Sequence, residues 1–247
     1  LVRDTLAANP NTVVVLINGS PVAMPWVDDV PAILECWYPG MEGGSAIART
    51  LFGDHNPGGK LPVTFPRALE DSPAHRSLRT FPGTGGTVYY EEELFVGYRH
   101  FDKHAIEPLF PFGHGLSYTR FDYAELALDR SELREGDSLG VSLRLSNAGS
   151  RAGTEVVQVY IADLEAPDDR PPQALKGFVR VALDPGEADT VKLRIDADAL
   201  RIYCPGKDRW RLPRGEFELR VGSSSRDIRL RKTFTITPGA RALEEAS

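Results

Sequence analysis

Hydrophobic and polar residues alternate along most of the chain after about residue 121. VSLRLS at 141–146 places Val141, Leu143 and Leu145 on one face and polar side chains on the other. EVVQVYI, VKLRI, FELRV and IRLRKTFTI repeat this period of two, and the turn signals NAGSRAG, DPGE, LPRG and VGSSSRD separate the runs. The pattern predicts an antiparallel, all-β sandwich of about seven strands over residues 121–240, followed by a frayed or helical tail at 241–247.

The first 70 residues show the pattern of an α/β layered sandwich. TVVVLINGS at 12–20 and AILECWYPG at 32–40 are continuous apolar runs, typical of strands that are buried on both faces. Helical patterns precede the first run and follow the second, where Gly53 is placed to end the helix, and PVAMPWVDDV between them predicts a short helix or turn. This order predicts a parallel sheet. Two strands make an incomplete sheet, so we expect further strands from outside this sequence.

The segment between these two patterns has no regular period. Residues 54–118 are rich in Pro, Gly and aromatic residues, as in GGKLPVTFP, RTFPGTGGTVYY and EPLFPFGHGLSY. A segment of this length is longer than the free loops of compact domains, and its Phe and Tyr content argues against disorder. We expect it to wrap over another surface and pack its aromatic side chains there. The aromatic-rich connector is assigned to residues 71–120.

Composition and charge narrow the classes of partner. The chain has 247 residues, 41% of them hydrophobic and 26% charged, which is typical of a globular protein. The net charge of -6 and the lack of a strongly basic stretch argue against nucleic acid, and no apolar run approaches the length of a membrane span. Cys36 and Cys204 lie far apart, which argues against a disulfide scaffold and leaves a cytoplasmic or a secreted location open. LVRDTLAANPNT at the start shows neither a secretory signal nor an initiator Met, so we expect the chain to continue upstream.

Two motifs suggest ligand sites that their details do not support. GDHNPGGK resembles a phosphate-binding loop, but Gly59 stands where that motif needs Lys, and Lys60 is followed by Leu61 instead of Ser or Thr. We interpret it as a tight turn whose glycines supply positive φ angles. His100 and His104 have a spacing that, on a helix, suits a metal ion. Their aromatic neighbours instead indicate a strand or loop, so we predict a structural role and no metal or cofactor.

Three sets of polar residues have alternative interpretations. Glu91, Glu92 and Glu93 could include a general acid, or they could form a solvated run with ion pairs to Arg99 and Arg76. Glu42 follows a strand end near a helix N-terminus, where open α/β sheets bind ligands and where an acidic residue also complements the helix dipole. The second role is favoured for Glu42, because no other catalytic carboxylate is identified nearby. NGS at 18–20 matches a glycosylation acceptor, but it ends a buried strand and Pro21 follows.

Several longer motifs resemble glycoside hydrolase family 3, the β-glucosidase group. WYPGMEGGSAIARTLFGDHNPGGKLPVTFP at 37–66 is similar to its signature, and the likeness continues through YYEEELFVGYRHFD at 89–102 and PLFPFGHGLSYTRFDY at 108–123. GTEVVQVYI, LKGFVRVALDPGE and GEFELRVGSSSRDI resemble the immunoglobulin/fibronectin type III-like domain that ends many such enzymes. The likeness covers almost the whole chain in the expected order. It is closer to the glucosidase branch than to the xylosidase branch, and a xylosidase specificity stays an alternative.

The resemblance implies a retaining β-glucosidase that hydrolyses terminal non-reducing β-D-glucosyl residues. In the family, an Asp of a TIM barrel attacks the anomeric carbon, and a Glu on a loop of the α/β sandwich acts as acid and base. Neither motif has a counterpart here, because the chain starts just downstream of the expected Glu loop. The resemblance therefore places both carboxylates upstream, in an N-terminal TIM-barrel portion that is either a separate chain or a preceding segment. We assign no catalytic role to Glu42, Glu91, Glu92 or His55, and no substrate-binding residue.

These expectations make the chain a C-terminal part of an enzyme, inactive alone, in which the connector braces the barrel against the sandwich. The alternative from another class is a stand-alone carbohydrate-binding or interaction module. In that hypothesis, exposed aromatic residues such as Tyr160 or Trp210 stack on sugar rings, although Tyr160 also suits an edge packing role. Binding of cellobiose by the isolated chain would distinguish the module from the enzyme part.

Overall fold

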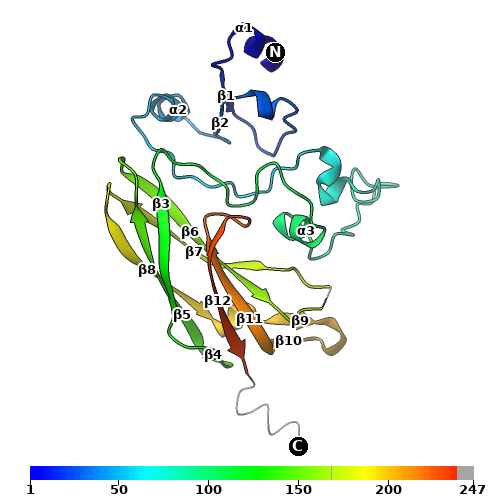
Figure 1. Ribbon diagram of the computed structural model, residues 1–247. Coiled ribbons are helices and arrows are strands. Elements are labelled where there is room, and N and C mark those ends of the chain that lie inside the picture. The colour runs from blue at the N-terminus through cyan, green and yellow to red at the C-terminus, as the bar shows by residue number, and fades with distance from the viewer. Residues whose placement is uncertain (168, 238–247) are drawn as a thin grey trace, which may run out of the picture.

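The computed structural model describes residues 1–167 and 169–237, so the predicted tail at 241–247 lies outside the described residues (Figure 1). A small α/β portion stands at one end, the connector crosses the middle, and a β-sandwich forms the largest part. None of the described helices has the length and apolar character that a membrane span requires.

The α/β portion begins with the predicted helix, strand, strand and helix. These elements are α1 (Val2–Ala8), β1 (Val13–Leu16), β2 (Ala32–Glu35) and α2 (Gly43–Leu51), and the short 3-10 helix η1 (Val27–Asp29) precedes β2. Strands β1 and β2 pair in parallel, from Val13 opposite Ala32 to Leu16 opposite Glu35. Gly53 has a φ of 82°, as expected for a residue that ends a helix. The strands are shorter than the apolar runs that predicted them.

The sheet of the α/β portion is incomplete among the described residues. It contains β1 and β2 only, and Val13 and Ile17 remain 47% and 60% exposed. The prediction that both strands are buried on both faces is therefore wrong for this chain by itself. The physical reason is the one anticipated above, since two strands cannot cover each other's faces and outer edges.

The β-sandwich consists of two packed sheets. The first has the order β4-β12-β11-β6-β7 and the second has the order β3-β5-β8. Neighbouring strands pair antiparallel, except for a short parallel contact between β12 and β4. The strands are β3 (Phe121–Leu128), β4 (Glu132–Leu133), β5 (Ser138–Asn147), β6 (Gly153–Asp163), β7 (Ala174–Leu183), β8 (Ala188–Asp196), β11 (Gly215–Gly222) and β12 (Ile228–Ile236).

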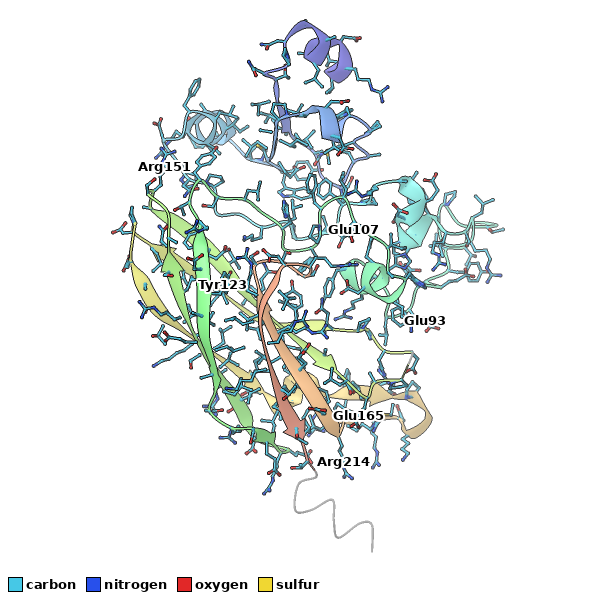
Figure 2. All side chains as sticks on the ribbon, viewed as in Figure 1. Glu93, Glu107, Tyr123, Arg151, Glu165 and Arg214 are labelled. Atoms are coloured by element: carbon cyan, nitrogen blue, oxygen red, sulfur yellow. The ribbon has the colours of Figure 1, made fainter. Side chains whose placement is uncertain are left out.

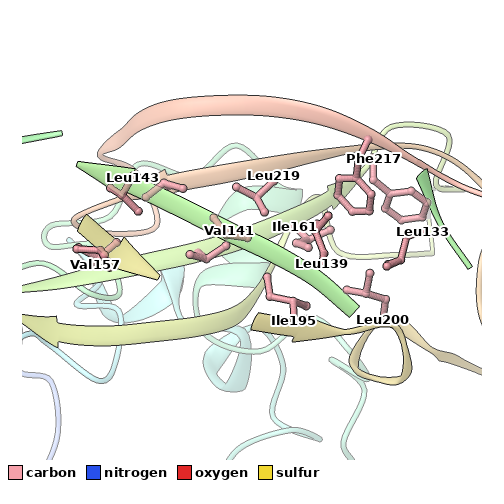
Figure 3. Packing of buried hydrophobic residues seen from close by; sticks show 14 of the residues in the cluster. Leu133, Leu139, Val141, Leu143, Val157, Ile161, Ile195, Leu200, Phe217 and Leu219 are labelled. Carbon is pink, nitrogen blue, oxygen red and sulfur yellow. The ribbon is translucent and has the colours of Figure 1, made fainter. Parts of the chain in front are cut away.

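The inward-facing residues of the alternating runs form the hydrophobic core, as predicted. Figure 3 shows side chains of β5, β6 and β11 meeting between the two sheets. Phe217 of β11 stacks on Phe234 of β12, with ring centroids 5.6 Å apart. Each fully buried aliphatic or aromatic side chain contributes roughly 1.5–3 kcal/mol. Other core members, none more than 5% exposed, are Leu139, Val141, Leu143, Leu145, Val157, Val159, Ile161, Leu219 and Val221.

The connector lies across the end of the sandwich that faces the α/β portion (Figure 1). It contains the 3-10 helices η2 (Leu69–Asp71) and η3 (Pro73–His75) and the helix α3 (Tyr98–Lys103). An isolated bridge joins Phe110 of the connector to Phe65, which precedes the connector. The ring of Tyr98 packs against Phe112 and Tyr160, with centroids 5.0 and 5.9 Å apart, so aromatic packing fastens the connector as expected.

A small hairpin leaves the sandwich on another side. The 3-10 helix η4 (Ala197–Leu200) leads into β9 (Ile202–Cys204), the 3-10 helix η5 (Pro205–Lys207) and β10 (Arg209–Arg211). Strands β9 and β10 pair antiparallel and form a two-stranded sheet of their own. The hairpin is therefore free of the sandwich's hydrogen-bonded sheets.

Candidate functional site

The polar residues that the sequence analysis considered do not converge on one place. Glu42 is the exposed N-cap residue of α2, and its side chain makes no capping hydrogen bond. Glu42 therefore has the predicted position at the helix start but does not cap the helix through its carboxylate. His55 is also exposed, and its backbone N–H donates to the carbonyl of Arg49 at 3.0 Å, within the turn that follows α2.

The acidic run at 91–93 has a different ion-pair partner from the predicted one. Glu91 pairs with Arg79 at 2.7 Å, whereas Arg76 approaches Nε2 of His104 at 3.2 Å. The prediction of ion pairs from this run to Arg76 and Arg99 is wrong for Glu91. The cause is a local turn, because the N–H of Tyr89 donates to the carbonyl of Arg79 and so brings Glu91 beside that arginine.

The two histidines lie on a helix, not on the strand or loop that their neighbours suggested. His100 belongs to α3 and His104 is its C-terminal cap residue, with ring centroids 4.7 Å apart. His100 is only 2% exposed, and its Nε2 has no hydrogen-bond partner among the described residues. Burial, reinforced by His104 and Arg76, lowers the pKa of His100. The described part of the chain gathers no group of three or more His, Cys, Asp or Glu side chains suited to a metal ion.

Tyr160 and Trp210 have opposite environments. Tyr160 is 0% exposed, and its hydroxyl donates to Oε1 of Gln158 at 2.6 Å. Stacking of a sugar on Tyr160 is therefore wrong, because the connector covers the outer face of β6. Trp210 is 62% exposed on β10 and lies beside Tyr203, with ring centroids 5.6 Å apart. Trp210 stays available to a ligand.

The GDHNPGGK segment is a packing element between the α/β portion and the sandwich. Gly53 has the predicted positive φ, at 82°, whereas Gly58 and Gly59 do not, so the interpretation is wrong for these two glycines only. Gly58 is needed for space, because an added Cβ would lie 3.0 Å from Thr154. Lys60 then reaches Glu155 of β6 at 2.8 Å, with 12% and 9% of the two side chains exposed. This arrangement explains the lysine without a phosphate.

A buried polar cluster fastens the connector to the sandwich. Nε2 of Gln158 donates to the carbonyls of Gly113 and Ser223 at 3.1 and 2.6 Å. Asp102 of α3 pairs with Arg226 at 2.9 Å and accepts a hydrogen bond from Gln173 at 3.0 Å. Burial raises the pKa of Asp102, although Arg226 and Gln173 act in the opposite direction. The cluster fixes where α3 sits on the first sheet.

A second set of hydrogen bonds joins α2 and the turn after it to the β5–β6 end of the sandwich. Nδ2 of Asn56 donates to the carbonyl of Ala152 at 2.9 Å, and Arg151 donates to the carbonyl of Gly53 at 2.8 Å. The hydroxyl of Tyr118 donates to the carbonyl of Thr50, also at 2.9 Å. In Figure 2, Arg151 lies at the end of the sandwich nearest α2. These contacts hold the α/β portion and the sandwich together as one support.

Most of the exposed large hydrophobic residues of the support lie in its first part. Among the described large hydrophobic residues that are exposed, all but Leu164, Phe178, Tyr203 and Trp210 lie within residues 1–118. An extensive exposed apolar surface marks an interaction site. We call the following residues the apolar face; their exposed fractions range from 43% to 97%: Ile17, Tyr38, Met41, Leu51, Phe52, Leu78, Phe81, Val88, Tyr90, Leu94 and Val96.

Comparison with known proteins identifies the two parts of this support. Residues 1–118 match the Glycosyl hydrolase family 3 C-terminal domain, and residues 155–225 match the Fibronectin type III-like domain. The chain belongs to glycosyl hydrolase family 3. This confirms both the resemblance and the fold class that the sequence indicated, an α/β portion followed by a fibronectin III-like sandwich. The finer domain boundaries at residues 70 and 120 stay predictions.

Relatives of the family 3 chain are named as β-glucosidases. It is 44% identical to "Thermostable beta-glucosidase B" of Acetivibrio thermocellus over 236 residues, covering 96% of this chain and 31% of that protein. It is 44% identical to a "Beta-glucosidase" of Rhizobium radiobacter over 93% of this chain and 28% of that protein. The family 3 chain thus spans roughly a third of the length of these relatives and corresponds to their C-terminal portion.

Solved structures show the same similarity in three dimensions. DesR, a β-glucosidase from Streptomyces venezuelae in complex with D-glucose, superposes with a TM-score of 0.90 at 40% identity, covering 96% of the family 3 chain and 30% of that chain. β-Glucosidase 3B from Thermotoga neapolitana in complex with glucose superposes with a TM-score of 0.83 at 41% identity. The match covers 94% of the family 3 chain and 32% of the Thermotoga chain. The arrangement of α/β portion, connector and sandwich is therefore that of family 3 β-glucosidases.

Proposed function

We propose that this chain is the supporting C-terminal portion of a retaining β-glucosidase and is inactive alone. The observation that carries the proposal is the match to the C-terminal portion of β-glucosidases at 44% identity. The whole enzyme then hydrolyses terminal non-reducing β-D-glucosyl residues. A retaining reaction needs a nucleophile and an acid/base carboxylate about 5–5.5 Å apart. The resemblance to the family implies that both carboxylates lie upstream, and no residue of this chain is given either role.

The proposed partner is an N-terminal TIM-barrel portion, and the apolar face supports this choice. Strands β1 and β2 have uncovered outer edges among the described residues, which suit strands of the same sheet supplied from elsewhere. Leu78 and Tyr90 of the connector are 76% and 83% exposed. The part of the connector that carries them projects away from the sandwich (Figure 1). Covering such side chains with a second surface is favourable by roughly 25 cal/mol per Å² of apolar area.

The projecting residues 78–96 are proposed to brace the barrel at the distance that catalysis requires. A displacement of about 1 Å in a reacting group can reduce a rate about a hundredfold. In the complete enzyme we expect Leu78→Ala combined with Tyr90→Ala to lower kcat more than it changes KM. Phe178→Ala is the matched control, because Phe178 is 67% exposed on β7 of the sandwich. Unchanged kinetics in the double variant would remove the bracing role.

Substrate specificity is tested by an assay of the complete polypeptide that contains these 247 residues. Hydrolysis of p-nitrophenyl β-D-glucoside should exceed hydrolysis of p-nitrophenyl β-D-xyloside when the two kcat/KM values are compared. A reversed preference would support the xylosidase alternative, and activity on neither substrate would contradict the proposed reaction.

A second candidate function is a carbohydrate-binding module, which the exposure of Trp210 supports. Calorimetry with cellobiose separates this candidate from the first. Binding of cellobiose by the 247-residue chain without any upstream portion would favour the module. Absence of binding, together with hydrolysis by the complete enzyme, would favour the supporting role.

A further inference from the structure

The β9–β10 hairpin has two different faces. Its antiparallel register places Tyr203 directly opposite Trp210, so these two aromatic side chains share one face. Cys204 and Arg211 alternate with them and therefore lie on the other face. Both faces are separate from the junction that holds the α/β portion, because the hairpin leaves the sandwich near β11 (Figure 1).

An open pocket lies on the face that carries Arg211. Its volume is about 440 Å³, which is within the range of small-ligand sites. The wall combines three cationic side chains with a thiol and a tight turn. The lining residues are Arg170, Cys204, Pro205, Gly206, Lys207 and Arg211.

The described residues leave the positive charge of this pocket mostly without ion-pair partners. Lys207 and Arg211 form no ion pair with any carboxylate of the described residues, and Nε of Arg211 lies 2.9 Å from Sγ of Cys204. Arg170 donates to the carbonyl of Tyr203 at 3.2 Å and reaches the Asp169 carboxylate only at 3.8 Å. The hairpin's own acid, Asp208, accepts a hydrogen bond from the Tyr203 hydroxyl.

Three arginines of the sandwich's first sheet are paired more closely, although Arg194 of β8 reaches Asp196 only at 3.9 Å. Arg220 and Arg231 share the carboxylate of Glu218 at 2.5 and 2.7 Å, and Arg229 pairs with Asp227 at 2.6 Å. Asp163 is a further acid near the hairpin, and burial raises the pKa of its carboxyl overall, although Arg211 acts to lower that pKa. The cluster of three cations with one weak carboxylate contact is therefore a local feature within a chain of net charge -6.

We propose that this pocket binds the carboxylate of an acidic sugar, such as a uronate residue of a plant or microbial glycan. Guanidinium groups match carboxylates with two parallel hydrogen bonds, and Arg170 and Arg211 supply two such groups on one pocket. A nucleic acid would need a longer basic surface than this hairpin provides. The choice of a sugar rests on the proposed function, whereas the choice of an anion rests on the pocket itself.

Calorimetry with the complete enzyme and trigalacturonate tests the proposal at about 0.15 M salt. We expect binding that weakens at least tenfold in the double variant Arg170→Ala, Arg211→Ala, and that also weakens in Lys207→Gln. Trp210→Ala is the control on the opposite face of the hairpin, and Arg144→Ala removes an exposed arginine of β5; both should bind as the unchanged enzyme does. Thermal unfolding of each variant shows whether the sandwich is intact.

Three results would overturn the proposal. The first is that cellotriose, the uncharged analogue, binds as tightly as trigalacturonate, and the second is that a single-stranded oligonucleotide of equal charge does so. The third is that Trp210→Ala abolishes binding while the arginine variants keep it. Hydrolysis of the p-nitrophenyl glucoside is measured in the same preparations. An active enzyme that does not bind trigalacturonate would therefore refute the pocket and leave the proposed function in place.

Discussion

Individual buried charges decide how firmly the α/β portion and the sandwich are joined. Lys60 contacts Glu155 at 2.8 Å and also donates to the carbonyl of Gly115 at 3.1 Å. Because both side chains are almost fully buried, removing one partner leaves an uncompensated charge in the interior. In the sequence, Lys60 stands only in an incomplete phosphate-loop motif. Its ion pair could not be predicted, because its partner Glu155 lies far along the chain.

We predict that Lys60→Met lowers the free energy of unfolding by about 3–5 kcal/mol. The double variant Lys60→Met, Glu155→Leu should recover much of the loss, because apolar residues can replace a buried pair at little cost. Arg194→Met is the control, since the Arg194–Asp196 pair is exposed and surface pairs contribute little. The measurement is denaturant unfolding of the complete enzyme, followed on the transition of the sandwich. Equal losses in the single and double variants would contradict the account.

His100 makes stability depend on pH. Its pKa is lowered in the folded protein by burial first and then by His104 and Arg76, while the backbone of Asp71 acts in the opposite direction. The unfolded chain therefore binds a proton more readily than the folded chain below about pH 6.5. The stabilising contribution is complete above that value and is lost as the pH falls through the folded pKa.

The expected result is a fall in Tm on acidification below about pH 6.5 that is smaller in His100→Gln than in the unchanged protein. His114 acts with the same sign, because burial and Lys60 lower its pKa as well, so part of the fall should persist. Differential scanning calorimetry at a series of pH values measures both curves. Parallel curves would show that His100 does not contribute.

At the scale of elements, the periodicity of the sequence predicted the strands of the sandwich but not the contacts between segments that are distant in sequence. The alternating runs predicted the sandwich strands because a strand's two faces can be read from neighbouring residues. The same alternation places Tyr160 and Gln158 on the outer face of β6, away from the core between the two sheets. The connector covers this face through contacts such as Gln158 with Gly113, 45 residues apart in sequence. No local pattern encodes such a contact.

For the candidate site, the sequence predicted what this chain lacks but not how the residues that are present contact one another. The incomplete two-stranded sheet could be inferred from residues 12–40, whereas the location of the family carboxylates outside this chain stays a prediction. The helix containing His100 and the pairing of Glu91 with Arg79 could not be inferred, because both depend on how an aperiodic segment folds back on itself. The hairpin pocket also escaped prediction, since Arg170 meets Arg211 only after the chain has crossed β7 and β8.

The turn at Gly113 is the element on which the connector's fit depends. Gly113 has a φ of 81°, and an added Cβ would lie 2.1 Å from Oε1 of Gln158. We predict that Gly113→Ala destabilises the protein by about 1–3 kcal/mol through backbone strain and displacement of that side chain. Gly59→Ala is the control in the nearby GDHNPGGK segment, because nothing lies within 4 Å of its added Cβ. Thermal unfolding distinguishes them, and equal stability of the two variants would contradict the fit.

On the scale of the whole molecule, the sandwich contains the closed hydrophobic core, and the α/β portion exposes apolar side chains. The sandwich has a closed core with residues such as Leu133 and Leu219 at 0% exposure, whereas the α/β portion leaves Met41 97% and Phe52 85% exposed. A stable support joined to an uncovered apolar face is the form expected of a piece that completes a larger enzyme. The polar junction explains how the face is held at a defined angle to the sandwich.

The most direct test of this account measures p-nitrophenyl β-D-glucoside hydrolysis by the 247-residue chain alone and by the same chain combined with the N-terminal portion of its enzyme. The account predicts no hydrolysis above the uncatalysed rate for the chain alone and clear hydrolysis for the combination. Hydrolysis by the purified chain in the absence of any upstream polypeptide would contradict the claim that the reacting carboxylates lie outside it.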